Sequence, residues 1–578
     1  MCRGVVLKKN IYGFVVRVGR RLLKIPFAAR ILNMVRSRRE EIREEIDEDI
    51  KFSIIVPVHD PALDRLDALI KTVQKQTYAN WELCFSGWGP CQNALEEALK
   101  EYSQDDSRIK HRLFENSQPE SANLNHAIDM TSGDYVALCK QDDLLRTDAL
   151  YENALAILKA NPDVLYSDYE KITKTGSGNL SLHFVPDWTK DLLYSQMYIS
   201  HFLTIKRSLL RQAGDFDSAF EPNHVYDIML RLSEFTEKIY HIPKVLISWR
   251  ETENHKELLQ ETGLNALNAH FKRVNGGKAH AYPTSLSQVW DARFETLNGN
   301  PKVSIIIPIK DKLDLTRNCV NSILGKSTYE NYEIIIVNNG STEDSTVEWL
   351  EQARVTMDNI IVVDALYDFN WSKLNNHGMR YATGDVFVFM NNDTEVITPD
   401  WIERLCENAL RDDIGAVGPL LLYDDGTIQH AGVVVGMSGL ADHVYKKEKP
   451  IHKTSPFVSP LVNRNVLAVT GACLCISRKA LDKIGSFNEN FIICGSDVEL
   501  CIRAHEAGYR NMYNANVKLY HFESKSRDSY IPEIDFEMSH KAYAPYLRSF
   551  DPYYNPNFDL KSVFPRLVNR SQHEFKAT

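Results

Sequence analysis

The sequence contains one α/β pattern twice, with 251 residues between corresponding positions. Three pairs of segments keep this spacing: FSIIVPV (52–58) and VSIIIPI (303–309), TYANWEL (77–83) and TYENYEI (328–334), and SGDYVALCKQDD (132–143) and TGDVFVFMNNDT (383–394). A repeat at one fixed offset indicates a duplicated domain with a common internal layout. The chain therefore has to fold as two related domains.

Each copy begins with a β-branched run that ends at a proline, which is typical of a buried parallel strand. Amphipathic helices follow over 63–76 and 313–324. Further strands are expected over 81–85, 109–113 and 135–139 in the first copy and over 332–337, 360–363 and 386–390 in the second. Strands that alternate with helices predict an α/β fold with open sheets, whose ligands bind at the carboxyl ends of the strands.

This layout predicts five segments. They are a basic amphipathic helical extension with an acidic connector (1–50), a first domain (51–254), a helical linker (255–300), a second domain (301–530) and a C-terminal tail (531–578).

The charge is unevenly placed along the chain. Residues 1–39 contain 11 Lys and Arg and no acidic residue, and the whole chain has a net charge of −10. Residues 40–578 therefore have a net charge of −21. This acidic balance argues against a nucleic-acid partner. The basic segment predicts either an interfacial helix on an anionic membrane or a helix that packs on the protein with a solvated basic face.

No apolar run reaches the ~18–20 residues of a membrane-spanning helix, so none is predicted. The ten cysteines include no CxxC pair, which indicates a reducing compartment. We therefore expect a cytoplasmic location, with peripheral contact at the inner face of the membrane as the alternative that residues 1–39 add.

Polar residues follow two predicted strands of the second copy. Asp393 in NNDTE comes after the strand 386–390, as in a divalent-metal site whose shell a diphosphate completes, although a helix cap would use the same residue. Asn338 and Asn339 in NNGS suit hydrogen bonds to a base or ribose, and equally an ordinary turn.

Two more candidates lie near the end of this copy. Asp497 opens a helix, where a carboxylate stays ionised and can act as a general base, or simply caps the helix. His521 ends the strand-like NVKLYH and is a metal ligand, a phosphate donor or a core histidine.

Taken in this order, the motifs resemble the family-two glycosyltransferases, which have the GT-A fold. The segments that carry the resemblance are VSIIIP, NYEIIIVNNGS, NNDTE, TGACLCISRKALDKIGSFNE, GSDVELCIRAHEAGY and YHFESKSR. More narrowly, the chain is similar to tandem-domain members that build bacterial surface polysaccharides such as O-antigen or capsule. The segments for that narrower likeness include PDWTKDLLYSQMYISH, HIPKVLISWR, IQHAGVVVGMSGLADHVY and DPYYNPN. The resemblance covers nearly everything after residue 50.

The resemblance implies inverting transfer of a sugar from a nucleotide-diphosphate donor to a growing surface polysaccharide or lipid-linked glycan. It implies that Asp393 and His521 hold Mg²⁺ or Mn²⁺ and that Asp497 deprotonates the acceptor hydroxyl. The donor contacts that it implies are Pro308, Asn338, Asn339, Asn376 and Asn392. Two positions depart from the family pattern, because Asn338 and Ser496 stand where related chains usually have acids.

The first copy lacks most of this chemistry. At the corresponding positions it has Gly87 and Trp88, then Lys140, Gln141 and Asp142, then Val225 for Asp497, and Ser248 near the place of His521. A valine cannot act as a base, and a lysine ammonium repels a divalent cation. We therefore expect the first domain to transfer no sugar. The alternative is a bifunctional enzyme in which Asp227 or His224 serves instead.

Two other classes of protein are considered. A non-catalytic glycan-binding scaffold would not need Asn339, Asp393, Asp497 and His521 together. A dehydrogenase would need GxGxxG after its first strand, and a kinase or ATPase would need GxxxxGK[ST]; the sequence contains neither motif there.

Overall fold

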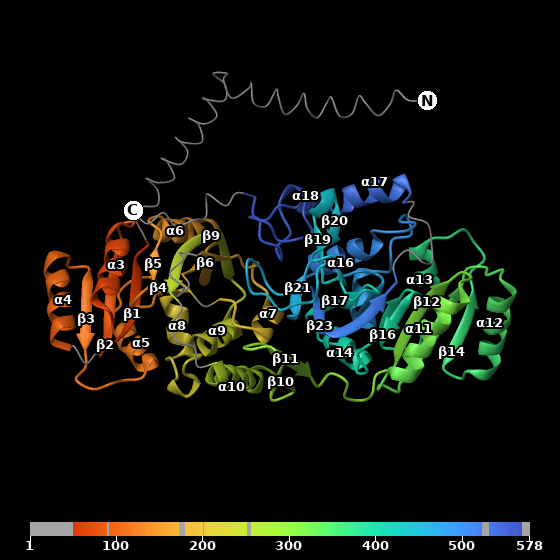
Figure 1. The fold of residues 1–578 in the computed structure, drawn as a ribbon, viewed down its shortest axis with the longest axis horizontal. Helices are drawn as coiled ribbons and strands as arrows, with labels where there is room; N and C mark the ends of the chain where they lie inside the picture. The colour runs from red at the N-terminus through yellow and green to blue at the C-terminus, as the bar shows by residue number, and fades with distance from the viewer. Residues whose placement is uncertain are drawn as a thin grey trace, which may run out of the picture.

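The computed structural model describes residues 50–88, 92–172, 180–199, 201–250, 256–522 and 531–568. The basic extension and its connector up to residue 49 lie outside these residues. Two α/β domains lie side by side along the long axis of the molecule, the first in red to yellow and the second in green to blue (Figure 1). The predicted α/β fold with two tandem domains is confirmed.

Each domain is built on one mixed sheet, and the two sheets have the same strand order. In the first, the order is β3 (Ile109–Leu113), β2 (Trp81–Trp88), β1 (Phe52–His59), β4 (Tyr135–Leu138), β8 (Thr204–Lys206), β6 (Val164–Ile172), β9 (Ile239–Arg250) and β5 (Leu144–Leu145), with β7 (Leu180–His183) on β6. In the second, it is β14 (Ile360–Asp364), β13 (Tyr332–Asn338), β12 (Val303–Ile309), β15 (Val386–Met390), β22 (Cys473–Ser477), β17 (Ile414–Leu422), β23 (Arg510–His521) and β16 (Thr394–Val396), with β18 (Ile428–His430) on β17 and β21 (Arg464–Val466) on β23.

The helices repeat in the same way. The first domain has α3 (Leu63–Gln74), α4 (Gln92–Asp105), α5 (Glu120–Asp129), α6 (Ala149–Ala160), α7 (Lys190–Ser195), α8 (Arg207–Ala213), η1 (Ser218–Phe220), α9 (His224–Phe235) and α10 (Lys256–Asn275). The second has α11 (Leu313–Lys326), α12 (Asp344–Thr356), α13 (Trp371–Met379), α14 (Trp401–Ala409), α15 (Arg478–Ile484), α16 (Ser496–Glu506), α17 (Glu533–Ala542) and α18 (Ala544–Arg548). Two small hairpins complete the fold, β10 (Ala279–Pro283) with β11 (Trp290–Phe294), and β19 (Val433–Val435) with β20 (Ala441–His443) across η2 (Met437–Gly439).

A buried glutamate joins the beginnings of three strands in the second sheet. Glu333 Oε1 of β13 accepts hydrogen bonds from Ser304 Oγ of β12 at 2.6 Å and from Thr383 N, just before β15, at 2.7 Å. Ser304 Oγ in turn accepts from Gly384 N at 2.9 Å, and a Cβ on Gly384 would lie 2.7 Å from that oxygen. The repeated sequence segments therefore meet at one point.

The first domain contains the same network. Glu82 Oε1 accepts from Ser53 Oγ at 2.6 Å and from Ser132 N at 2.5 Å, and Gly133 N donates to Ser53 Oγ at 2.9 Å. Although burial raises the pKa of Glu82, the donors from Lys110, Ser53 and Ser132 hold it well below its ordinary value. What the two copies share in sequence is thus a structural joint at the amino ends of the strands.

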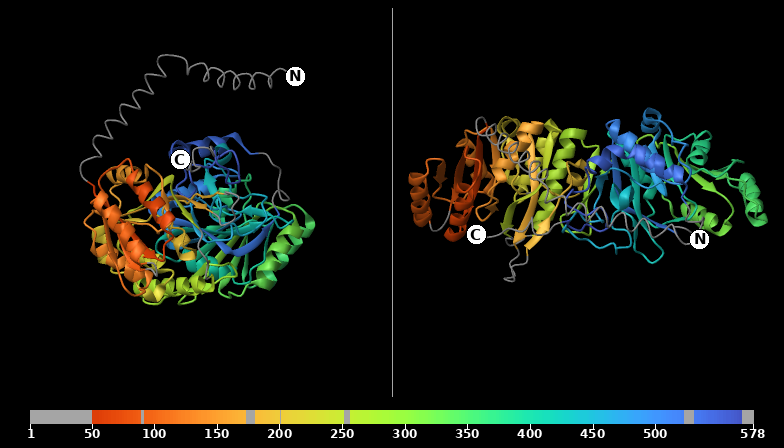
Figure 2. Two further views of the ribbon diagram at one scale, coloured as in Figure 1. Left: turned by 60° about the vertical axis from the view of Figure 1, so that its left-hand side comes forward. Right: turned by 90° about the horizontal axis from the view of Figure 1, so that it is seen from above.

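One hydrophobic cluster contains residues of both domains. Residues from β6, α7 and α9 of the first domain pack in one cluster with the β19–β20 hairpin and with Phe457, Val458, Tyr554 and Phe558. Asn555 Nδ2 also donates to Asp168 Oδ1 and to Val185 O, both at 2.9 Å. The segment predicted as a tail thus packs against the first domain, and Figure 2 shows the two domains in close contact from two further directions.

A buried ion pair crosses the same interface. Asp191 of α7 accepts from Arg411 Nη1 at 2.5 Å and from Asn465 Nδ2 at 2.6 Å. The two charged side chains are 2 and 8 % exposed. Because a charge this deeply buried needs a partner, the pair requires the two domains to be docked.

Within the described ranges, no helix is both long and apolar enough to cross a bilayer.

We predict that Asp191→Ala lowers the free energy of unfolding by about 3 kcal/mol, because it leaves Arg411 buried with only the more distant Asp413 as a counter-charge. The matched control is Asp412→Ala, which removes an ion pair to Lys479 whose side chains are 86 and 77 % exposed, and should cost close to nothing. Calorimetric and urea unfolding of both variants measure the difference, and equal shifts would contradict the importance of the interface pair.

Candidate active site

The candidate residues of the second domain gather at the carboxyl edge of its sheet, opposite the Glu333 joint. Strands β12, β13 and β15 are parallel neighbours, so their ends bring Pro308, Asn338 and Asp393 to one edge. This is the edge at which open α/β sheets bind their ligands.

Asp393 and His521 lie against each other there. Strand β16 runs antiparallel to β23 and sets Thr394 opposite His521. As a result, His521 Nε2 lies 3.3 Å from Asp393 Oδ1, with both side chains buried. Among the described residues, the buried Nδ1 of His521 has no hydrogen-bond partner. The strand register therefore joins two candidates that are 128 residues apart in sequence.

Trp371, which the sequence did not single out, connects this pair to the candidate base. Its Nε1 donates to Asn391 Oδ1 at 3.3 Å, and Asn391 Nδ2 lies 3.4 Å from His521 Nε2. The indole also covers Gly471, where an added Cβ would be 2.7 Å from the ring. Gly471 N then donates to Asp497 Oδ2 at 2.7 Å. The only sequence signal for Trp371 was the tryptophan in FNWSKLNN, and a tryptophan in such a segment is usually interpreted as a core residue.

Asp497 is the second residue of α16 and is half-buried. Gly495 occupies the N-cap position, and no side chain caps the helix, so Asp497 is not its cap. Burial raises the pKa of the Asp497 carboxyl above its ordinary value, against the opposing effect of hydrogen bonds from the backbone of Gly471 and Val498. A carboxylate with a raised pKa is a stronger base than an ordinary aspartate.

The two asparagines after β13 shape the next part of the edge. Asn339 Nδ2 donates to Ala365 O at 2.8 Å and to Tyr367 O at 2.7 Å, and its buried Oδ1 has no hydrogen-bond partner in the described part of the chain. Asn338 is partly exposed, and its amide bridges Asp364 Oδ1 and Ser341 N. Pro308 is also partly exposed and pairs with Val337 in the register of β12 and β13.

Asn376 and Asn392 have internal partners. Asn392 Nδ2 donates to Thr316 Oγ1 at 3.1 Å. Asn376 Nδ2 donates to Phe487 O at 2.8 Å, and Asn376 Oδ1 accepts from Phe487 N at 3.1 Å.

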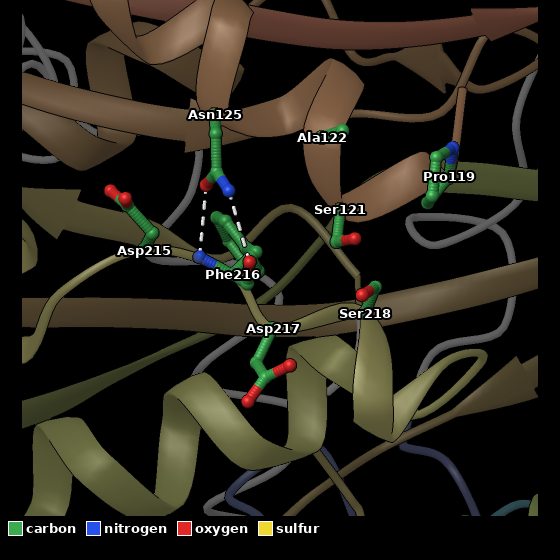
Figure 3. A pocket seen from close by; sticks show the side chains of 8 residues that line it. All are labelled: Pro119, Ser121, Ala122, Asn125, Asp215, Phe216, Asp217 and Ser218. Atoms are coloured by element: carbon green, nitrogen blue, oxygen red, sulfur yellow. Dashed lines mark hydrogen bonds between the residues drawn. The ribbon is translucent and has the colours of Figure 1, made fainter.

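In the first domain, Asn125 and Phe216 make the same pair of hydrogen bonds as Asn376 and Phe487 in the second. Their two hydrogen bonds, both 2.9 Å, lie in an open pocket of about 410 Å³ (Figure 3). In each copy, this contact joins a helix to a loop. It joins α5 to the loop after α8 in the first domain, and α13 to the loop after α15 in the second. A role of Asn376 in donor binding stays a prediction.

In the first domain, side chains of the protein fill the equivalent edge. Gln141, the counterpart of Asn392, donates to His59 O at 3.0 Å and accepts from His59 N at 2.9 Å. Trp88, the counterpart of Asn339, packs on the His59 ring at 5.5 Å and donates through Nε1 to Glu115 O at 3.0 Å. These contacts cross from the end of β4 to the ends of β1 and β2.

The remaining acid of the first domain faces a cation of the protein itself. Arg65 Nη1 lies 3.7 Å from Asp142 Oδ2, at the position where the second domain has Thr316. The same 251-residue offset that revealed the other replacements could have shown this one.

The strand register corrects one sequence correspondence. Leu144 pairs with Ser248 in β9, as Glu395 pairs with Tyr520 in β23. The position of His521 is therefore taken by Trp249, one residue beyond the Ser248 expected from the sequence. Trp249 stacks on His201 with ring centroids 4.3 Å apart.

The substitute residues considered for the first domain have structural contacts. Asp227 Oδ2 accepts from Arg231 Nε and Nη2, at 2.9 and 2.6 Å. Glu499 and Arg503 form the same pair in α16, so Asp227 corresponds to Glu499 and not to Asp497. His224 is buried, and burial lowers its pKa.

Comparison with known proteins identifies the family. The model of the family described as "Glycosyl transferase family 2" matches residues 53–223 and 304–485, more than half of the chain. The chain belongs to glycosyl transferase family 2. The family match in two segments agrees with the duplicated sheets.

Three relatives are similar to this chain. It is 36% identical to the uncharacterized protein y4gI of Sinorhizobium fredii over 549 residues, 91% of this chain and 59% of that protein. It is 36% identical to the O-antigen biosynthesis protein RfbC of Myxococcus xanthus over 531 residues, 89% of this chain and 40% of RfbC. The Escherichia coli protein WfgD, named UDP-Glc:alpha-D-GlcNAc-diphosphoundecaprenol beta-1,3-glucosyltransferase, is 34% identical over 125 residues, 22% of this chain and 48% of WfgD. The chain thus spans less than two thirds of each relative's length.

The Asp393–His521 pair offers two donors of the kinds that divalent cations bind, a carboxylate and an imidazole. Asp393 and His521 supply one carboxylate oxygen and one imidazole nitrogen at one point. In the described residues, no group of three or more His, Cys, Asp or Glu side chains could hold a metal ion. A cation at this pair would take the rest of its shell from phosphate oxygens and water, as Mg²⁺ usually does.

We predict that Gly471→Ala destabilises the protein by about 1–3 kcal/mol, because the new methyl group would force the Trp371 indole away from Asp497. Gly325→Ala is the matched control, because nothing lies within 4 Å of the added atom, and it should stabilise by up to about 1 kcal/mol. Thermal unfolding measures both variants, and an unchanged midpoint for Gly471→Ala would show that the indole does not fill this space.

Proposed function

We propose that the chain is an inverting, metal-dependent glycosyltransferase with one active site, in its second domain. It moves a sugar from a nucleoside-diphosphate donor to a hydroxyl of a growing surface polysaccharide or lipid-linked glycan. The observation that carries this proposal is that Trp371 links the Asp393–His521 pair, through Asn391, to Asp497, through Gly471, at the carboxyl edge.

Asp497 is the residue proposed to accept the proton of the acceptor hydroxyl. Backbone N–H groups of Gly471 and Val498 fix the orientation of its carboxylate. Deprotonation prepares the hydroxyl for in-line attack at the anomeric carbon, which inverts the configuration. This route forms no covalent enzyme intermediate and needs no protein nucleophile.

Asp393 and His521 are proposed to hold Mg²⁺ or Mn²⁺ beside the diphosphate. The ion neutralises the charge of the departing nucleoside diphosphate. Asn338 and Asn339 would contact the nucleoside, with Pro308 forming the neighbouring wall of its cleft. The unpartnered Asn339 Oδ1 supports this placement, because a buried acceptor is expected to find a donor.

The names of two relatives support the proposed acceptor class. RfbC is named for O-antigen biosynthesis, and the name of WfgD specifies a diphosphoundecaprenol acceptor. An acceptor of this kind would place the protein at the cytoplasmic face of the membrane. Residues 1–39, with 11 basic residues, would contribute the contact with anionic lipid.

The first domain is proposed to be non-catalytic. Arg65 faces the Asp142 carboxylate as its counter-charge, and Gln141 and Trp88 both contact His59 at the end of β1. Val225 stands at the position of the base. The first domain therefore lacks the residues that would bind the donor and deprotonate the acceptor.

We predict that Asp393→Ala lowers turnover by roughly a hundredfold or more, because the diphosphate loses its metal. The matched variant Asp142→Ala removes the equivalent first-domain acid and should leave turnover unchanged. Release of nucleoside diphosphate is measured with Mn²⁺ and a panel of UDP-, GDP- and dTDP-sugars, with a lipid-linked glycan supplied as acceptor.

Each outcome of that experiment is decisive. Equal loss in Asp142→Ala would establish a working first domain and a bifunctional enzyme. No turnover by the wild-type protein with any donor, acceptor present, would favour the glycan-binding scaffold.

We predict that the transfer rate falls on the acid side with a midpoint above pH ~4, where an ordinary aspartate titrates. The base must be ionised, and burial raises the pKa of Asp497, so protonation removes activity at a higher pH than usual. The rate is measured at saturating donor and Mn²⁺, with nucleoside-diphosphate binding followed at each pH as a control. An acid limb at the ordinary aspartate pKa would contradict this assignment.

A further inference from the structure

The loop that precedes Asp497 is bound by a single carboxylate of the C-terminal segment. Asp535 of α17 accepts hydrogen bonds from three consecutive backbone N–H groups: Ile492 N at 2.6 Å, Ile493 N at 2.8 Å and Cys494 N at 3.1 Å. Asp535 is 1% exposed. Hydrogen bonds to an ionised acceptor are roughly twice as strong as neutral ones, so one side chain holds the whole loop.

The same helix also fixes the residue at which the loop becomes α16. Tyr543 Oη donates to Gly495 O at 2.9 Å. Gly495 has φ +98°, and a Cβ there would lie 2.7 Å from Ser539 Oγ and 2.9 Å from Tyr543 Oη. The loop therefore fits against α17 only with glycine at this position. Figure 1 shows α17 lying above α16.

The loop is held from its other side by the residue that connects the two halves of the active site. Trp371 N donates to Ile492 O at 2.7 Å, while Ile492 N donates to Asp535. Ile492 is thus fixed between α13 and α17. Ile492 lies five residues before the candidate base, and α16 begins between them, at Ser496.

The first domain makes the equivalent contact without a carboxylate. Helix α10 follows β9 as α17 follows β23, and it packs against the start of α9. There Asn223 Nδ2 donates to Leu259 O at 2.6 Å and to Thr262 Oγ1 at 2.9 Å. Asn223 corresponds to Gly495, so these contacts match those of Gly495 with Ser539 and Tyr543. The counterparts of Ile492 and Ile493, which are Phe220 and Glu221, donate through their backbone N–H groups to Asp217 O and Ser218 O and not to α10. The charged clamp occurs in the copy that has the candidate base.

We propose that Asp535 is a positioning residue for glycosyl transfer, which holds the 492–495 loop so that Asp497 points at the acceptor hydroxyl. This inference rests on the proposed role of Asp497. It extends the active site to a helix that the sequence assigned to the tail. Small displacements of a reacting group cost large factors in rate, so the loss of this clamp should appear in turnover.

The test compares Asp535→Asn with Glu537→Gln, which removes an exposed carboxylate from the same helix. The asparagine keeps the size of the side chain but loses its charge and one of its two acceptor oxygens. We expect Asp535→Asn to lower kcat by about tenfold or more, while the donor KM and Mn²⁺-dependent binding of nucleoside diphosphate stay within about twofold. Glu537→Gln should match the wild type in all three.

A double-mutant cycle separates positioning from general destabilisation. If Asp535 acts through Asp497, then Asp497→Ala/Asp535→Asn will be no slower than Asp497→Ala alone. A multiplicative loss in the double variant, or a parallel loss of nucleoside-diphosphate binding in Asp535→Asn, would overturn the proposal.

Amide hydrogen exchange tests the clamp without relying on turnover. Peptides covering 488–500 should exchange faster in Asp535→Asn than in Glu537→Gln, whereas peptides covering 332–345 should be unchanged. If the 488–500 peptides keep their protection, Asp535 does not hold the loop and the inference is wrong. A silent wild-type enzyme would instead count against the proposed function, and the exchange result would still decide the clamp.

Discussion

The buried Glu333 carboxylate is the contact on which the geometry of the active site depends. It receives hydrogen bonds from the beginnings of β12 and β15 while it lies on β13, so three parallel strands are aligned at one end. Since each strand is rigid and of set length, alignment at the amino ends also fixes where the carboxyl ends finish. A slip of one residue would turn the side chains of a strand to the opposite face. The candidate nucleoside and metal residues therefore owe their common location to a carboxylate that takes no part in chemistry.

Because Glu82 forms the same joint in the first domain, the two copies have equivalent frames and differ at the other edge. In the second domain, two buried polar atoms at that edge, Asn339 Oδ1 and His521 Nδ1, have no hydrogen-bond partner among the described residues. In the first domain, Gln141 binds both the N–H and the C=O of His59. A polar group that already has its partner in the protein gives up a hydrogen bond if a ligand replaces it. Gln141 and His59 thus satisfy each other at this edge of the first domain, whereas the buried Trp249 Nε1 and Asp143 Oδ1 have no hydrogen-bond partner among the described residues.

Much of this was predictable from the sequence, and the rest depends on contacts between distant residues. The β-branched runs identified β1 and β12, and the fixed offset identified the duplication, because both patterns are local. Asp393 and His521 could be named, but only the pairing of β16 with β23 brings them together. The replacement of His521 by Trp249 rather than Ser248 depends on the register of β9, which short sequence similarity cannot resolve. Asp535 lies in the segment assigned to the C-terminal tail, and its contact with the loop at 492–494 joins residues 41 to 43 positions apart in sequence.

The first domain matters to the second as a packing surface, whatever chemistry it has lost. The β19–β20 hairpin and residues such as Phe457 and Phe558 belong to the second half of the chain, yet they are buried in the core of the first domain. Separation of the domains would expose these apolar side chains to water and leave Asp191 and Arg411 without each other. The first domain and the segment from Asp551 onward therefore stabilise the elements around the second sheet together. The docking depends on the Glu82 frame and on the interface residues of the first domain, and it places no demand on the carboxyl edge of the first sheet.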